Sequence, residues 1–290
     1  MKNLPLLFTI IFLFNACKTK EVLPAFVDID PNFEKYLVNE KIDKDGLVNG
    51  KMNVDDGKGV TKIDISTSGI KSLSGIEVFI DLQELDCSFN KLTVLDISKN
   101  VNLQMLSCDF NQLSVLDISR NINLRMLSFY FNQLTVLDVS KNINLQTLSC
   151  DLNELTVLDV NKNVNLNKLG CSYNNKLTIL DISKNVNLQM LDCLANQLAV
   201  LDVSKNVNLQ TLVCGRNPLT ILDISKNINL QKLVCGYNQL TVLDVSKNIN
   251  LQALDCRENP IKTICVSDVA KANLNAFWYK DQAATYSLCK

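Results

Sequence analysis

Hydrophobic and polar positions alternate along most of the chain with a fixed period. From Leu82 onward the pattern LQxLxCxxNQLTVLDISKNxN recurs every 21 residues. Phe129 fills the one position where Cys is missing, and an extra Asn in the pair Asn174-Asn175 lengthens one step to 22 residues. Self-similarity at a fixed period indicates a solenoid, in which each repeat forms one turn and contacts only its neighbours. The Cys positions that mark the turns are 87, 108, 150, 171, 193, 214, 235 and 256.

Each turn has two halves that carry the same spacing. In the first half Leu106 and Cys108 alternate with polar residues, which predicts a strand with one face turned inward. The amide of Asn111 can then bond backbone groups of a neighbouring turn at the bend. The second half repeats the order of Leu, Leu, an apolar residue and Asn, and its β-branched residues favour extended chain. We therefore expect a narrow coil with parallel strands on both flanks and little helix.

The two ends of the repeat region are predicted to be caps, which a solenoid needs to cover its open hydrophobic ends. The solenoid itself is expected over residues 60–266, with residues 17–59 as an N-terminal linker and cap and residues 267–290 as a C-terminal cap. A short helix is expected at residues 32–39. Degraded turns are marked by Val60, Ile63, Ile65, Ser68 and Ile70 at the start, and by Ile261, Ile264 and Val266 at the end.

The spacing Leu103-x-x-Leu106-x-Cys108-x-x-Asn111-x-Leu113 resembles the leucine-rich repeat, in the nested 21-residue class found in bacteria. The segments LSGIEVF (residues 73–79) and DVAKANLNAFWYKDQAATYSLC (residues 268–289) resemble the entry segment and the terminal cap of Bacteroidetes repeat proteins. The resemblance covers roughly residues 60 to 266. It implies an α/β-type leucine-rich repeat solenoid, mostly parallel β, with the architecture of internalins and adhesins.

The N-terminus has the layout of an export signal. Lys2 provides the positive end, residues 6–14 are an apolar core too short to span a membrane, and Asn15-Ala16-Cys17 follow. Ala16-Cys17 resembles the lipobox of bacterial lipoproteins, although Phe14 stands where Leu is usual. The resemblance implies a signal peptide over residues 1–16 and lipid attachment at Cys17, hence a lipid-anchored protein of the cell envelope at the outer membrane. The alternative is an ordinary cleaved signal with an incidental Cys.

Composition argues against catalysis and against nucleic acid as a partner. The chain contains no His, which removes the usual general base and metal ligand, and its net charge is −1. No nucleophile stands beside a base, and no phosphate-binding loop occurs. We expect a protein that is not an enzyme and that needs no cofactor.

The eleven cysteines fall into different classes. Eight occupy the inward strand position, where bridging two neighbouring turns would require both side chains to leave their packed rotamers. They are expected to be buried thiols, and a single column offers no tetrahedral metal site. Cys265 instead stands at the register of Asp223 and Asp244, which is predicted to face outward. A disulfide with Cys289 is expected to fix the C-terminal cap.

Outward positions of the main strands form candidate binding columns. The first half of this face is aromatic and acidic, whereas the second half carries Arg216, Lys232 and Arg257. Exposed aromatic rings are typical of binding surfaces. The alternative is that the rings cover the bend and shield the Asn column. The candidate binding residues are Phe89, Phe110, Tyr130, Phe131, Tyr173, Tyr237, Asp109 and Asp151.

The opposite flank carries one Asp per turn, with Lys or Arg three residues later. A solvated structural face is expected, since the basic residues offset the acidic ones and the intervening Ser can bond locally. Calcium along this column is the alternative, but each turn offers one carboxylate where the ion takes six or more oxygens. Residues 41–50 loosely follow a calcium-loop pattern, yet Lys41 and Met52 stand where acidic ligands are needed, which favours a turn.

The function expected from the sequence is binding of a protein partner on the concave sheet, in adhesion or host contact. A glycan-binding accessory protein is the alternative, because an aromatic row on a rigid sheet can also stack on sugar rings. Lys18-Thr19-Lys20-Glu21 leaves open whether the chain lies on the surface or on the periplasmic side.

Overall fold

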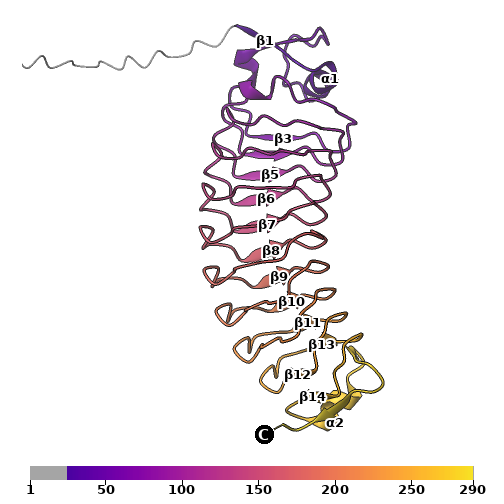
Figure 1. Cartoon of the computed structure of the whole chain (residues 1–290). Helices are drawn as coiled ribbons and strands as arrows, with labels where there is room; N and C mark the ends of the chain where they lie inside the picture. The colour runs from indigo at the N-terminus through magenta and orange to yellow at the C-terminus, as the bar shows by residue number, and fades with distance from the viewer. Residues whose placement is uncertain (1–24, 290) are drawn as a thin grey trace, which may run out of the picture.

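The computed structural model describes residues 25–289, which form an elongated coil of stacked turns with a cap at each end (Figure 1). The expected signal peptide and Cys17 lie outside the described residues. No helix within residues 25–289 is long and apolar enough to cross a membrane.

Each turn contributes one short strand to a parallel sheet, called the main sheet below. It has eleven strands in the order β15-β13-β11-β10-β9-β8-β7-β6-β5-β4-β3. Equivalent residues of successive turns pair, as Leu106 does with Leu127. Its strands are β3 (Lys62–Asp64), β4 (Glu84–Asp86), β5 (Met105–Ser107), β6 (Met126–Ser128), β7 (Thr147–Ser149), β8 (Lys168–Gly170), β9 (Met190–Asp192), β10 (Thr211–Val213), β11 (Lys232–Val234), β13 (Ala253–Asp255) and β15 (Trp278–Tyr279).

The core follows directly from the repeat. Within one turn the side chains of Leu103, Leu106, Cys108, Leu113 and Ile118 are at most 1% exposed, and the equivalent positions of the other turns are buried in the same way. Because every turn buries the same small set, the core is a continuous apolar column along the coil axis. The parallel coil with little helix that the sequence predicts is confirmed.

Buried Asn side chains hold the bend that follows each main strand. The Asn132 amide donates to the carbonyl oxygens of Cys108, Phe129 and Tyr130 at 3.0, 3.2 and 3.4 Å. Its Oδ1 accepts the N–H of Leu113 at 3.0 Å. One side chain therefore satisfies backbone groups of two turns, which a bend leaves without a sheet partner.

The second flank differs from the expectation of strands in every turn. Its one sheet comprises only β12 (Val242–Asp244), β14 (Thr263–Cys265) and β16 (Thr285–Ser287), at the C-terminal end. Side-chain hydrogen bonds do not account for the difference, because Ser119 N–H donates to Asp117 Oδ1 in an unpaired turn just as Ser246 N–H donates to Asp244 Oδ1 beside β12. The flank contains no helix over residues 82–241, as expected, but the chain there does not pair as strands.

The N-terminal cap packs a helix over the first turns. It contains β1 (Phe26–Asp28), α1 (Pro31–Asn39), β2 (Lys51–Asn53) and the 3-10 helices Val54–Gly57 and Ile76–Val78, with β1 antiparallel to β2. Asp30 caps α1 by accepting the N–H groups of Asn32 and Phe33. The buried carboxylate of Glu34 accepts backbone N–H groups of residues 49–51, so residues 41–50 form a turn held by the cap.

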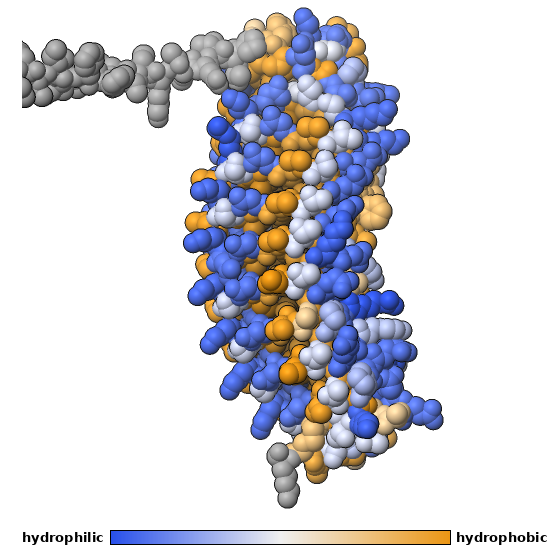
Figure 2. All heavy atoms as spheres, viewed as in Figure 1, coloured by the Kyte–Doolittle hydropathy of each residue, from blue (hydrophilic) through white to orange (hydrophobic). Residues whose placement is uncertain are grey.

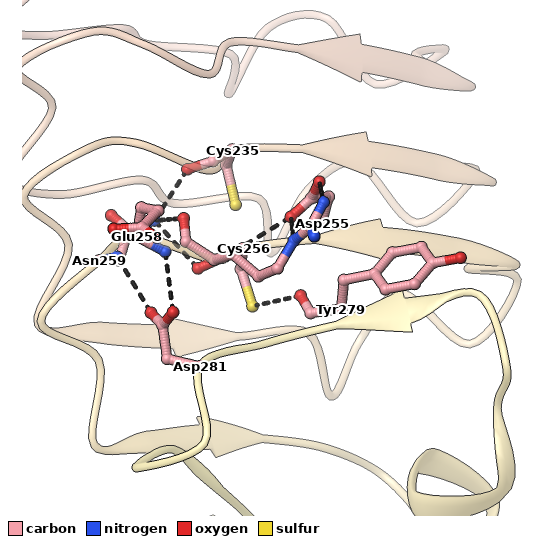
Figure 3. Close-up of polar contacts among 8 residues, drawn as sticks. Cys235, Asp255, Cys256, Glu258, Asn259, Tyr279 and Asp281 are labelled. Carbon is pink, nitrogen blue, oxygen red and sulfur yellow. Dashed lines mark hydrogen bonds and ion pairs between the residues drawn. The ribbon is translucent and has the colours of Figure 1, made fainter.

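The C-terminal cap substitutes for a further turn (Figure 3). It contains α2 (Val269–Leu274), and β15 pairs with β13. The Asp281 carboxylate accepts the N–H groups of Glu258 and Asn259 at 3.0 and 3.1 Å, and Tyr279 carbonyl accepts the N–H of Cys256 at 2.9 Å. These groups occupy hydrogen-bonding positions that the next turn fills elsewhere in the coil.

The structure joins Cys265 and Cys289 in a disulfide, with their Cα atoms 5.3 Å apart. Cys265 is aligned with Asp244, as the register predicts. It is nevertheless buried rather than outward-facing, because the cap covers it.

Candidate binding surface

The aromatic column lies at the bend after each main strand, in an unusual backbone conformation. In nine successive turns this residue has φ between 50° and 58°, and none of the nine is Gly, Asn or Asp. Left-handed φ is disfavoured for large side chains. Backbone hydrogen bonds impose it, as when Phe110 N–H donates to Tyr130 carbonyl at 2.7 Å. The column comprises Phe89, Phe110, Phe131, Leu152, Tyr173, Ala195, Arg216, Tyr237 and Glu258.

Four of the candidate aromatic residues form one cluster near the N-terminal end. Phe89 and Phe110 stack with ring centroids 4.4 Å apart, and Phe110 and Phe131 stack at 5.2 Å. Tyr130 packs against Phe110 at 5.0 Å. Phe89 and Phe131 remain 53% and 51% exposed, so the rings retain free area for a partner. We call these four residues the aromatic cluster.

Toward the C-terminal end of this face, tyrosine rings contact arginines instead of other rings. Tyr237 sits beneath the guanidinium of Arg216, 4.5 Å from its ring centroid, and Arg257 lies 4.9 Å from the ring of Tyr279. Arg257 also pairs with Asp255 at 2.6 Å. The C-terminal part of the face therefore presents arginines stacked on rings.

The candidate carboxylates Asp109 and Asp151 belong to a network with serines. Asp109 Oδ1 accepts Ser128 Oγ–H at 2.6 Å and the N–H of Tyr130 at 2.7 Å. Burial raises the pKa of both carboxyl groups, and these hydrogen bonds oppose the rise. The chain thus places negative charge in a partly desolvated position beside the aromatic cluster.

Sequence reasoning missed several members of this surface. Asp192, Ser128, Ser149 and Ser172 all contribute to the carboxylate network. The alternation along each strand could have identified them. In every turn it places two residues outward, the third residue of the strand and the residue two positions later, such as Ser107 and Asp109.

A hollow opens on the main sheet at Gly170. Its volume is about 340 Å³, and it lies over β7, β8 and β9. The lining includes Tyr130, Asp151, Lys168, Tyr173, Met190, Asp192 and Leu194. It therefore brings together two candidate tyrosines and one candidate carboxylate that are separated along the chain.

A second, polar groove follows the edge of the main sheet. Its volume is about 550 Å³, and amide side chains dominate its lining. The lining residues are Gln83, Asn102, Gln104, Asn123, Arg125, Asn144, Gln146 and Asn165.

The Asp column of the second flank is held by local hydrogen bonds. Asp117 Oδ1 accepts the N–H of Ser119 at 2.9 Å, and equivalent bonds of 2.8 or 2.9 Å recur in the other turns. This bond lowers the pKa of Asp117 more than the charge of Arg120 does. Within residues 25–289 no group of three or more acidic or Cys side chains is placed to hold a metal ion.

An apolar stripe runs along the length of the solenoid (Figure 2). On the second flank one β-branched side chain per turn points outward in register, with 58 to 77% of its surface exposed. These residues are Val94, Val115, Val136, Val157, Ile179, Val200, Ile221 and Val242. β-branched residues favour extended chain, and these side chains do not contribute to the core.

The cysteine column is entirely internal. All eight thiols are free and buried, and Phe129 occupies their register with no exposed surface. Burial raises the pKa of Cys214 and Cys256 to about 12, and shifts the remaining thiols in the same direction. Such thiols are inert as nucleophiles in the folded protein.

Solved structures of similar proteins carry the same architecture. No protein-family model and no curated protein matches the chain. The functional domain of InlJ from Listeria monocytogenes, which includes a cysteine ladder, matches with a TM-score of 0.80 and 30% identity, covering 91% of this chain and 63% of that chain. The internalin inlF from L. monocytogenes 4b F2365 matches with a TM-score of 0.59 and 18% identity, covering 94% of this chain and 95% of that chain.

A plant structure extends the comparison. The leucine-rich repeat ectodomain of the Arabidopsis thaliana receptor kinase GASSHO1/SCHENGEN3, in complex with Casparian strip integrity factor 2, matches with a TM-score of 0.50 and 24% identity, over 66% of this chain and 30% of that chain.

The two Listeria structures show that the fold is a leucine-rich repeat solenoid of the internalin type, as expected. The chain spans less than two thirds of the InlJ structure.

Proposed function

We propose that this chain is a binding protein whose main sheet recognises a protein partner, in adhesion or host contact. The observation that carries the proposal is the aromatic cluster: its three phenylalanines stack at left-handed backbone positions, and Phe89 and Phe131 keep about half of their surface free. Backbone strain persists where the surrounding structure enforces it, and it often accompanies function. Aromatic anchors supply contact area at low entropic cost.

The similar structures support a binding role over a catalytic one. The plant ectodomain is in complex with Casparian strip integrity factor 2, and the similar InlJ structure is that of its functional domain. In this chain the thiols are buried and titrate above the neutral range. A rigid array of repeated turns is suited to presenting an extended surface to a partner.

We further propose that Cys17 carries a lipid and anchors the chain in the cell envelope, at the outer membrane. The support is the sequence layout of Lys2, the apolar core and Ala16-Cys17. Cys17→Ser should release the protein from the membrane fraction. Protease treatment of intact cells then separates the two sides: digestion places the solenoid on the surface, and protection places it in the periplasm.

Capture of partner proteins tests the main proposal. The triple variant Phe89→Ala, Phe110→Ala, Phe131→Ala should lose a protein captured from membrane extracts by the parent chain. Val115→Ala, Val136→Ala, Val157→Ala is the matched control, because it removes three exposed apolar side chains from the other flank. Capture that survives the phenylalanine changes contradicts the proposal. A large drop in thermal stability of that variant indicates that the rings shield the bend instead.

A glycan-binding accessory role is the second candidate. It is favoured by the amide-lined groove along the sheet edge, whose Asn and Gln side chains can donate to and accept from sugar hydroxyls. A glycan array separates the two candidates. Saturable glycan binding that is lost in Arg125→Ala, with protein capture absent, supports the second candidate and rejects the first.

A further inference from the structure

The hollow at Gly170 interrupts a regular column of outward side chains. The equivalent residue is Ser in the three preceding turns, at positions 107, 128 and 149, and Asp192 in the turn that follows. A Cβ at Gly170 would lie 2.5 Å from Asp151 Oδ2. Glycine is therefore what allows the Asp151 carboxylate to lie over strand β8 at the floor of the hollow.

A single serine connects the two carboxylates of the hollow. Ser172 N–H donates to Asp151 Oδ1 at 2.7 Å, and Ser172 Oγ–H donates to Asp192 Oδ1. Their further donors are neutral: Ser149 Oγ–H to Asp151 Oδ2 at 2.9 Å, and Leu194 N–H to Asp192 Oδ1 at 3.2 Å. Neither carboxylate has an ion pair among the residues that the structure describes.

The negative charges of Asp151 and Asp192 are not offset by an ion pair within residues 25–289. Partial burial penalises the charge of Asp151, and the nearby charge of Asp192 adds to that penalty, so the pKa of Asp151 is raised. Lys168 lines the hollow but is an exposed side chain without an ion pair to either acid. A cation that entered the hollow would offset both negative charges, and each carboxylate retains lone pairs to accept from it.

The walls favour a planar cation. Tyr130 and Tyr173 contribute rings, and Met190 and Leu194 contribute apolar surface. A guanidinium is flat, stacks on aromatic faces and offers five N–H donors in a fixed fork, whereas an ammonium is a compact and strongly hydrated charge.

We propose that the hollow at Gly170 receives one arginine side chain of the protein partner, with Asp151 and Asp192 as its acceptors. The inference rests on the proposed protein-binding function and assigns it a point of specificity. It also predicts that the partner presents an exposed arginine next to the apolar group that contacts the phenylalanines, because Tyr130 belongs both to the aromatic cluster and to the lining of the hollow.

Selective labelling gives a direct test with defined probes. The chain has nine glycines, so ¹⁵N-glycine labelling of the full chain yields few resonances, and Gly170→Ala identifies that of Gly170. N-acetyl-arginine methylamide should shift the Gly170 resonance saturably. The citrulline analogue, which is neutral and nearly the same shape, should not.

Matched variants assign the effect to the hollow. Asp192→Asn should weaken binding of the arginine probe about tenfold, because one charged acceptor becomes neutral. Asp86→Asn is the control: Asp86 holds the same strand register and also accepts the N–H of the residue two positions later, but it lies outside the hollow. Lys168→Ala should strengthen binding, because it removes a like charge from the rim.

Several results would overturn the inference. These are equal shifts with the arginine and citrulline probes, an unchanged affinity in Asp192→Asn, equal binding of the lysine analogue, or tighter binding of free arginine, which would indicate an amino-acid ligand. The capture experiment is independent of these results. If capture still depends on the phenylalanines, the proposed function stands while the arginine assignment fails.

Discussion

The two buried Asn residues of each turn differ in how completely their amides are used. Asn132, after a main strand, donates to three carbonyl oxygens and accepts one N–H. Asn142, on the second flank, donates to two carbonyls, at 3.1 Å to Ile118 and 2.9 Å to Asn121, while its Oδ1 has no hydrogen-bond partner. An Ala at position 132 leaves the Leu113 N–H without its acceptor, whereas the two carbonyls that Asn142 contacts keep the backbone N–H groups of Asn121 and Leu124 as donors.

We expect Asn132→Ala to lower the free energy of unfolding by about 1–3 kcal/mol more than Asn142→Ala does, since a buried backbone group left unsatisfied costs about that much. Urea unfolding followed by circular dichroism measures both. Equal losses would show that the number of satisfied groups does not set the contribution of these amides.

At the scale of elements, the second flank couples stability to pH. Hydrogen bonds from the following Ser lower the pKa of the carboxyls in the Asp column, with the Ser119 N–H as the largest cause for Asp117 and the Ser140 hydroxyl as the largest cause for Asp138. A lowered folded pKa means that these groups stabilise the protein above the ordinary aspartate pKa, and that this stability is lost as pH falls through the folded pKa. Asp109 and Asp151 have raised pKa values and act in the opposite direction.

The prediction is a loss of stability as the pH falls from 5 to 3, to which the Asp column contributes. In Asp117→Asn, Asp138→Asn the amide oxygens can still accept the Ser N–H but cannot titrate, so the loss should be smaller. Urea midpoints at pH 5, 4 and 3 for the parent and the variant provide the measurement. Identical pH dependence in the two proteins would argue against a role for this column.

The C-terminal cap offers a second test at this scale. The disulfide between Cys265 and Cys289 closes a loop with a sequence separation of 24 residues. Replacing both with Ser should destabilise the cap by about 3 kcal/mol, by the loop-closure relation. Amide hydrogen exchange should quicken first in β14, β16 and α2. Unchanged protection in these elements would mean that packing, rather than the bond, holds the cap.

At the scale of the whole molecule, the repeat determines most of what could be predicted. The period located each inward position, so Leu106 and Cys108 are buried as expected, and register placed Cys265 beside Asp244. The prediction of strands along the second flank was wrong for residues 82–241, where the same sequence pattern as in β12 does not pair between turns. The period of the sequence predicts which side chains face inward, but it does not predict which backbone segments pair as strands.

The hollow at Gly170 also could not be predicted from the sequence. A single Gly170 among serines is visible in the sequence, but its effect depends on the path of the Asp151 carboxylate from the neighbouring turn. Likewise, the left-handed backbone at Phe110 arises from hydrogen bonds between turns and leaves no local signal. Features that depend on two turns at once were therefore not predictable from one.

The internal column of thiols allows local opening of the coil to be measured at each turn that carries a cysteine. Each turn contacts only its neighbours, so the ends of the stack should open at lower free energy than the middle. A thiol reagent reacts only where a turn has opened, and eight cysteines mark eight positions along the axis. Under native conditions modification should be slowest near Cys171 and faster at Cys87 and Cys256. Equal rates would mean that the whole coil opens in one step.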